Sequence, residues 1–117
     1  MPTKVDSRLK WNDTRFDVLE GRTYHYVAEG TWTDWKTECN AAGYSDPFLD
    51  RFSFLKRCRA ALWFQLVVAV DQKPSHTLPL LCHGHFVAPA SGRLWAYAND
   101  AALAYWNNTG SLTLTIH

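Results

Sequence analysis

The sequence predicts an all-β protein, an antiparallel jelly-roll β-sandwich of the galactose-binding domain-like kind. Three observations predict it. Apolar and polar residues alternate in several short runs, and Gly, Pro and Asn separate these runs at fairly regular intervals. Aromatic residues make up 15% of the chain, which suits the pleated surface of a sheet. No long stretch has the period of an amphipathic helix, so about seven short strands are expected.

The elements follow in chain order. The stretch WNDTRFDVLEGRTYHYVAEGTW predicts two strands, separated by a turn at Glu20-Gly21. Residues 33–54 have no clean period and predict a long loop with at most one helical turn. The apolar run ALWFQLVVAVD predicts a central strand that is buried on both faces, or a long strand shared by two sheets. LLCHGHFVAPASG, RLWAYAND and SLTLTIH predict the last three strands.

Length and composition predict the domain organisation. The chain has 117 residues, of which 47% are apolar and 20% charged, as in an ordered globular protein. We expect a flexible N-terminal arm over residues 1–10 and a single β-sandwich domain over residues 11–117. The cysteine count of three is odd and gives no disulfide framework. A Cys39–Cys58 bridge remains open, but free buried thiols fit a reducing compartment better.

Charge and hydropathy exclude several classes of partner. The net charge is +1, and the only basic cluster is the short Lys56–Arg59 run, so no nucleic-acid footprint is expected. The N-terminus has no apolar signal segment, and Gln65 interrupts an apolar run that is too short for a bilayer. We expect a soluble protein without a membrane partner, located in the cytoplasm or exported without a cleaved signal peptide.

The loop between the last two predicted strands is rich in carboxamide and carboxylate groups. Asp100 ends one strand, and Asn107 and Asn108 precede Thr109-Gly110, where the next strand begins. Calcium binds six to eight oxygens from such groups and from carbonyls. Asn and Gly are also the ordinary residues of tight turns. From the residue types alone, a turn and a calcium site both remain open.

The closing stretch YANDAALAYWNNTGSLTLTI resembles the C-terminal signature of the bacterial calcium-dependent galactophilic lectins, the PA-I-like family. Members of that family carry Asn-Asp, a six-residue gap, Asn-Asn-Ser/Thr-Gly and a final strand. WNDTRFDVLEGRTYHYVAEGTWTDW is similar to their opening strands, and the resemblance covers most of the chain from Trp11. It implies a galactose-binding-like sandwich that binds carbohydrate through one calcium ion.

The resemblance also implies the site residues. The calcium ligands would be the side chains of Asp100, Asn107 and Asn108 and carbonyls at Ala104 and Trp35. Sugar hydroxyls would coordinate the ion and form a hydrogen bond with Asp100. Further contacts with the sugar would come from Asp50, Trp35 and Trp106. The family uses a His and a Gln from the middle loop for the sugar, but this chain has Pro47 and Asp50 there.

No motif in the sequence predicts an enzyme. A nucleophile elbow, a phosphate loop and an HExxH pattern are absent from the sequence, and His83-x-His85 lacks the further ligands of a zinc site. The loop acids have no spacing that requires a glycosidase pair; they are Asp34, Asp46, Asp50 and Asp100. We therefore expect a non-enzymatic, calcium-dependent, lectin-like module for galactose-type sugars. The alternative is a structural or protein-interaction domain that has lost sugar binding. A third option is a hydrolase site in the middle loop. A homo-oligomer also remains open, since lectin modules often need several linked binding sites for avidity.

Overall fold

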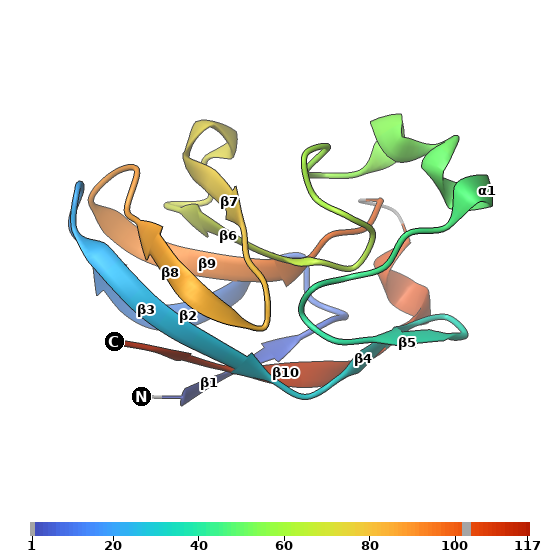
Figure 1. Cartoon of the computed structure of the whole chain (residues 1–117), viewed down its shortest axis with the longest axis horizontal. Coiled ribbons are helices and arrows are strands. Elements are labelled where there is room, and N and C mark those ends of the chain that lie inside the picture. Colours follow the sequence, from blue (N-terminus) through green and yellow to red (C-terminus); the bar gives the residue numbers. More distant parts are fainter. Residues whose placement is uncertain (1, 102–103) are drawn as a thin grey trace.

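In the computed structural model, which describes residues 2–101 and 104–117, two antiparallel sheets pack face to face (Figure 1). The larger sheet has the order β5-β4-β10-β3-β8, with β1 also paired to β10, and the smaller has the order β2-β9-β6-β7. The strands of the larger sheet are β1 Pro2–Asp6, β3 Thr23–Glu29, β4 Trp32–Asp34, β5 Thr37–Cys39, β8 His83–Val87 and β10 Asn108–Ile116. Those of the smaller are β2 Asn12–Val18, β6 Leu66–Val70, β7 Thr77–Pro79 and β9 Gly92–Ala98. The predicted β-sandwich is confirmed.

Helical structure is limited to short segments in the described part of the chain. They are α1 Pro47–Asp50 and the 3₁₀ turns η1 Ser53–Leu55, η2 Pro74–His76 and η3 Tyr105–Asn107. None of these helices has the length and apolar character needed to cross a membrane. The predicted helical turn of the middle loop corresponds to α1, which begins after Asp46, whose carboxylate accepts the amide of Phe48 at 2.8 Å.

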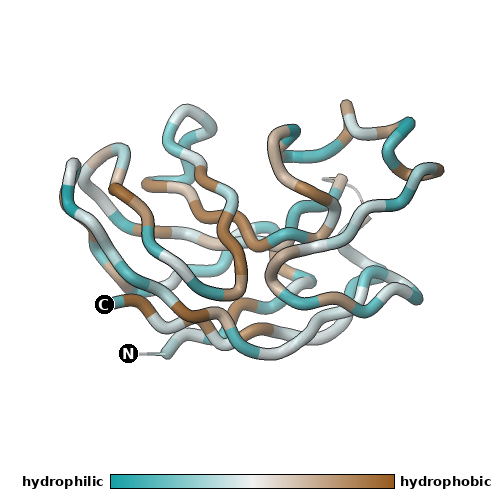
Figure 2. Tube along the Cα trace, viewed as in Figure 1, coloured by the Kyte–Doolittle hydropathy of each residue, from teal (hydrophilic) through white to brown (hydrophobic). Residues whose placement is uncertain are grey.

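The core lies between the sheets and follows the period-two pattern of the sequence. In β3, Tyr24, Tyr26 and Ala28 are buried and their neighbours are exposed, as the alternation predicts. All five residues of β6 are buried, which confirms the prediction of a strand covered on both faces. Figure 2 shows this apolar strand in the middle of the molecule. Loop 57–61 covers its outer side, where Ala61, Val67 and Tyr97 form a second small cluster.

The N-terminal arm expected over residues 1–10 is ordered over Pro2–Asp6, where β1 pairs with β10 from Pro2↔Thr115 to Asp6↔Ser111. Val5 is fully buried in the core. The stretch has too few apolar residues to show a strand period, and the pairing joins opposite ends of the chain. Sequence patterns report local order, so the prediction of a flexible arm was wrong over these residues.

The middle loop contains a hairpin that the sequence pattern does not predict. Strands β4 and β5 are joined by Trp35-Lys36, and Trp35 has φ +54, in the left-handed region. Two-residue hairpin turns normally carry Gly, Asn or Asp there. An aromatic residue in that conformation gives no turn signal. All three cysteines are free thiols and partly buried, and the Cys39–Cys58 bridge is not formed.

Candidate functional site

Asn99 anchors the end of β9 beside the loop that follows η1. Its side chain is fully buried, and its Nδ2 donates to the carbonyls of Cys58 and Leu62 at 2.9 Å each. Its Oδ1 accepts the amide of Cys58 at 2.9 Å. These bonds satisfy the carboxamide, so Asn99 has a structural role. They also fix the position of Asp100, the next residue.

Asp100 holds a buried carboxylate that is only half satisfied. Its side chain is 4% exposed, and Oδ1 accepts the amide of Ala101 at 2.7 Å. The buried Oδ2 has no hydrogen-bond partner among the described residues. Burial, followed by the negative charge of Asp34, raises the pKa of Asp100 to about 6. A buried carboxylate in this state is stabilised by a proton or by a cation.

Asn107 and Asn108 supply two more buried oxygens. Within the described chain, Oδ1 of each residue is buried without a hydrogen-bond partner. Asn108 is 1% exposed, and its Nδ2 donates to the carbonyl of Ser7 at 2.9 Å, which fixes the orientation of the amide. Leaving such a group unpaired costs about 1–3 kcal/mol. Three such oxygens close in sequence indicate a site that is completed by a ligand.

Strand β4 brings a second carboxylate to the same place. Asp34 pairs with Asn108 in the β4–β10 register, and the amide of Trp35 donates to the carbonyl of Asn107 at 3.2 Å. The hydroxyl of Tyr44 donates to Oδ2 of Asp34 at 2.5 Å. Burial raises the pKa of Asp34. Hairpin β4–β5 and the loop before β10 therefore form one continuous site.

Tyr44 is held in place by a close backbone contact. Its amide donates to the carbonyl of Trp63 at 2.8 Å. The preceding residue, Gly43, has φ +75, and a Cβ there would lie 2.6 Å from the Trp63 carbonyl oxygen. Only glycine fits this approach. The backbone of Gly43 thus allows Tyr44 to reach Asp34 from the middle loop.

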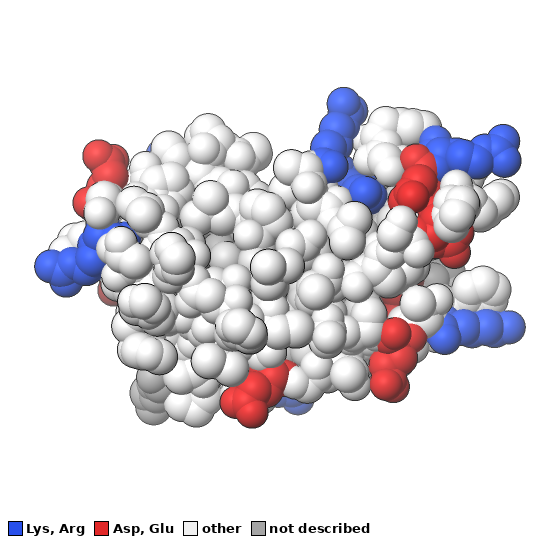
Figure 3. Space-filling view, viewed as in Figure 1, with Lys and Arg blue, Asp and Glu red and all other residues white. Residues whose placement is uncertain are grey.

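A cavity of about 600 Å³ opens beside these groups. Its polar wall includes Asp34, Asp100 and Asn107. Its apolar wall comes from the segment that holds α1 and η1, through Leu49, Phe52 and Leu55, among others. Figure 3 shows that charged side chains are sparse over the broad face of the sandwich in this view and gather at the end where α1 and β5 lie. The cavity has the size and mixed lining of a small-molecule site.

The structure brings together most of the site residues implied by the resemblance. Trp35, Asp100, Ala104 and Asn107 line the cavity. Asn108 is buried on β10, directly opposite Asp34 of β4. Trp35 is 68% exposed, with Nζ of Lys36 4.8 Å from its ring centroid.

Two implied sugar contacts lie elsewhere in the structure. Asp50 is exposed on α1, and Trp106 is 81% exposed on η3; neither lines the cavity.

Several cavity residues were not predicted as site residues, and three of them carry polar groups beside the buried oxygens. These three are Asp34, Tyr44 and Trp63, whose buried Nε1 lacks a partner among the described residues. Asp34 was noted only as a loop acid. Its place in the site depends on a strand register that the sequence does not reveal.

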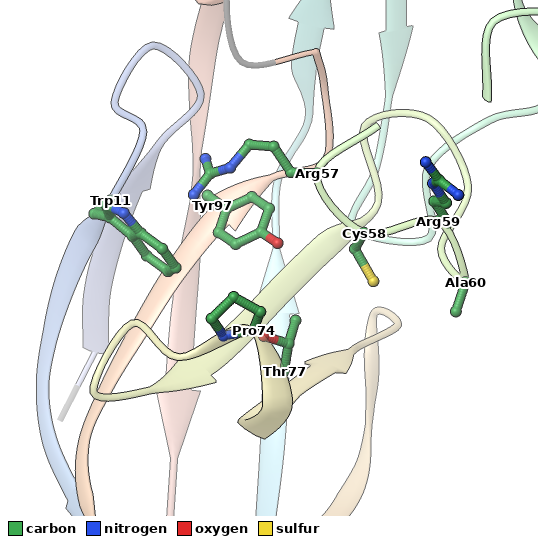
Figure 4. A pocket seen from close by; sticks show the side chains of 8 residues that line it. All are labelled: Trp11, Arg57, Cys58, Arg59, Ala60, Pro74, Thr77 and Tyr97. Atoms are coloured by element: carbon green, nitrogen blue, oxygen red, sulfur yellow. The ribbon is translucent and has the colours of Figure 1, made fainter. Parts of the chain in front are cut away.

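A second cavity of about 420 Å³ lies on the outer face of the smaller sheet (Figure 4). Arg57 lies 3.6 Å from the centroid of Tyr97 and 4.7 Å from that of Trp11. Its Nη1 donates to the carbonyl of Lys10 and the hydroxyl of Tyr105, at 2.6 Å each. The guanidinium is thus occupied in joining the loop to the sheet, and this cavity is the weaker candidate.

Three histidines, His25, His85 and His117, lie together on the outer side of the larger sheet. The ring of His25 is 5.9 Å from that of His85 and 6.2 Å from that of His117, between centroids. In residues 2–101 and 104–117, no group of three or more His, Cys, Asp or Glu side chains has the arrangement of a metal site. The site at Asp100 differs, because amide oxygens make up half of its side-chain groups.

Comparison with known proteins supports the fold. A search of solved structures finds the N-terminal domain of EclA, described as a PllA-like lectin, with a TM-score of 0.73. The match covers 99% of this chain and 93% of that chain at 15% identity. This chain has a lectin-like fold. No protein-family profile matches it, and neither does any curated protein.

Proposed function

We propose that the protein is a non-enzymatic, calcium-dependent carbohydrate-binding module. The observation that carries the proposal is the set of three buried oxygens, on Asp100, Asn107 and Asn108, that lack partners in the described chain beside an open cavity. Carboxylate and amide oxygens are ligands that a hard cation prefers. The lectin-like fold and the resemblance of the closing stretch to calcium-dependent lectins support the same function.

The residues of the loop have separate roles in this proposal. Asp100, Asn107 and Asn108 hold the ion through side-chain oxygens, and the carbonyls of Ala104 and Trp35 complete the set. Asn99 and Ser7 hold the neighbouring backbone and the amide of Asn108 in position. Calcium, when bound, would offer coordination positions to two neighbouring sugar hydroxyls. Oxygen ligands held rigidly in advance lower the entropy cost of binding.

The cavity suits a sugar with neighbouring hydroxyls, including galactose-type sugars. Trp35 exposes its ring at the rim, where an aromatic face can stack on the apolar side of a sugar ring. Pro47 and Asp50 provide neither of the middle-loop contacts that the galactophilic family uses. The binding energy in the cavity therefore rests on the ion, Trp35 and the apolar wall. We propose galactose-type sugars as ligands without a strict preference for galactose.

Calcium titration of chelator-treated protein tests the proposal. Calcium should raise the melting temperature of the wild type, because a ligand that binds only the folded state stabilises it. Asp100→Ala should stay folded and lose this shift, whereas the matched control Asp50→Asn, an exposed acid outside the cavity lining, should keep it. Wild-type protein that shows no shift in millimolar calcium would refute the proposal.

A structural or protein-interaction domain is the second candidate. Exposed apolar side chains on and after α1 favour it, namely Phe48, Phe54, Leu55 and Leu62. A glycan array with calcium separates the two functions. Calcium-dependent binding to sugars supports the lectin-like module, whereas calcium binding with a blank array supports the interaction domain.

A further inference from the structure

Asp34 lies outside the ligand set that the family resemblance implies, yet the strand register places it at the proposed ion site. Asp34 stands directly opposite Asn108 in the antiparallel pair of β4 and β10. Side chains in such a pair share one face of the sheet, with Cβ atoms about 4.5–5.5 Å apart. The carboxylate of Asp34 therefore lies beside the amide of Asn108, whose Oδ1 lacks a partner within the described chain.

The charges of the cavity also connect Asp34 to the ion. Asp34 and Asp100 line the same cavity, so the site brings two carboxylates to one wall. Among the described residues, neither carboxylate forms an ion pair. Lys36 is next to the site in sequence, but its Nζ lies over the ring of Trp35. Two half-buried or buried carboxylates without a counter-charge repel each other, and a divalent ion between them would neutralise both.

Tyr44 occupies only one oxygen of Asp34. The phenol donates to Oδ2 at 2.5 Å, and no side-chain hydrogen bond reaches Oδ1 from the rest of the described chain. The bond fixes the carboxylate plane while leaving Oδ1 available. The arrangement is that of a ligand oriented by a second residue, as is usual around metal ions.

We infer that Asp34 is a second carboxylate ligand of the ion, which binds through Oδ1 while Tyr44 orients it through Oδ2. The inference rests on the proposed function and names a residue of the same site. Its consequence is a preference for highly charged, oxygen-seeking ions, because two carboxylates attract a divalent or trivalent ion far more than a monovalent one.

The experiment compares three variants by calorimetric calcium titration and by terbium luminescence excited through the tryptophans of the cavity. Asp34→Asn should weaken calcium binding about tenfold or more and terbium binding further, since it removes a full charge from the site. It should also raise the melting temperature of the metal-free protein, because the repulsion with Asp100 is lost. Glu38→Gln is the matched control, an exposed acid on the same hairpin, and should change calcium affinity less than about twofold.

Tyr44→Phe separates a ligand from a merely structural residue. It removes the bond that orients Oδ2 and leaves the carboxylate, so calcium affinity should fall by less than in Asp34→Asn. If Tyr44→Phe weakens binding as much as Asp34→Asn, Asp34 only positions other groups and the inference fails. It also fails if Asp34→Asn binds calcium as tightly as wild type. A wild type that binds no calcium would refute the proposed function itself, which keeps the two failures distinguishable.

Discussion

The metal-free protein should be less stable at neutral pH than at acidic pH because of Asp100, and Asp100→Asn should abolish that part of the pH dependence. Burial and the charge of Asp34 raise the pKa of this carboxyl from 3.8 to about 6 in the folded state. Because the folded pKa exceeds the unfolded one, the folded state binds more protons between the two values. The contribution of Asp100 to stability therefore falls as the pH rises from about 4 to about 6, and it stays low above that range.

The magnitude follows from the size of the shift. One pKa unit corresponds to about 1.4 kcal/mol, so a shift of about two units amounts to roughly 2–3 kcal/mol. The side chain is 4% exposed, so solvent screens this effect little. Between pH 4 and pH 7, the free energy of unfolding of Asp100→Asn should thus rise by roughly 2–3 kcal/mol relative to that of the wild type. Any cost of burying the new amide group is the same at both pH values and cancels in this comparison.

Urea denaturation in the presence of a chelator measures the effect at pH 4 and pH 7 for both proteins. The difference between variant and wild type removes the contribution of titrating groups that do not interact with Asp100. Two results would refute the account of Asp100 as a buried carboxylate in need of a counter-charge. The difference in the free energy of unfolding could be equal at both pH values, or the variant could become less stable relative to wild type as the pH rises. Saturating calcium at pH 7 should restore the wild type and leave Asp100→Asn unchanged.

Three further predictions concern single side chains. Asn99→Ala should lower the free energy of unfolding by about 2–4 kcal/mol in urea denaturation, because it leaves the carbonyls of the anchored loop unpaired; a loss below about 0.5 kcal/mol would contradict the anchoring role. Val5→Ala should cost roughly 1–3 kcal/mol in the same assay, because Val5 is fully buried; a neutral effect would mean that β1 detaches in solution. Trp35→Ala should weaken sugar binding about tenfold in calorimetry while calcium affinity stays within about threefold, because only its carbonyl serves the ion; an equal loss of both would place its ring in the ion site.

The sequence predicts the fold where order is local. Alternation marks β3 through Tyr24 and Tyr26, and the continuous apolar run marks β6. The sequence-based prediction fails for β1, because Val5 becomes buried only when β1 pairs with the far end of the chain. It also fails at the β4–β5 hairpin, where Trp35 takes a left-handed conformation that sequence rules reserve for Gly or Asn.

The candidate site divides in the same way. Asp100, Asn107 and Asn108 lie within nine residues, so a sequence pattern suffices to group them. Asp34 comes from a distant strand, and only the register with Asn108 places it there. Asp50 is exposed on α1 outside the cavity, because the middle loop presents its apolar side chains to the cavity instead. Amino-acid composition and residue spacing do not determine which distant strands pair or how a long loop folds.

The hairpin of β4 and β5 forms one edge of the larger sheet, and β5 is its outermost strand. β4 pairs over only three residues with β10, from Asp34↔Asn108 to Trp32↔Gly110. An ion held by oxygens from both β4 and the loop before β10 would link these two segments and stabilise this edge of the sheet. Amide hydrogen exchange in Thr37–Cys39 and cleavage by proteases near the Trp35-Lys36 turn should then slow when calcium is added, so the ion would protect the sheet edge as well as hold a ligand.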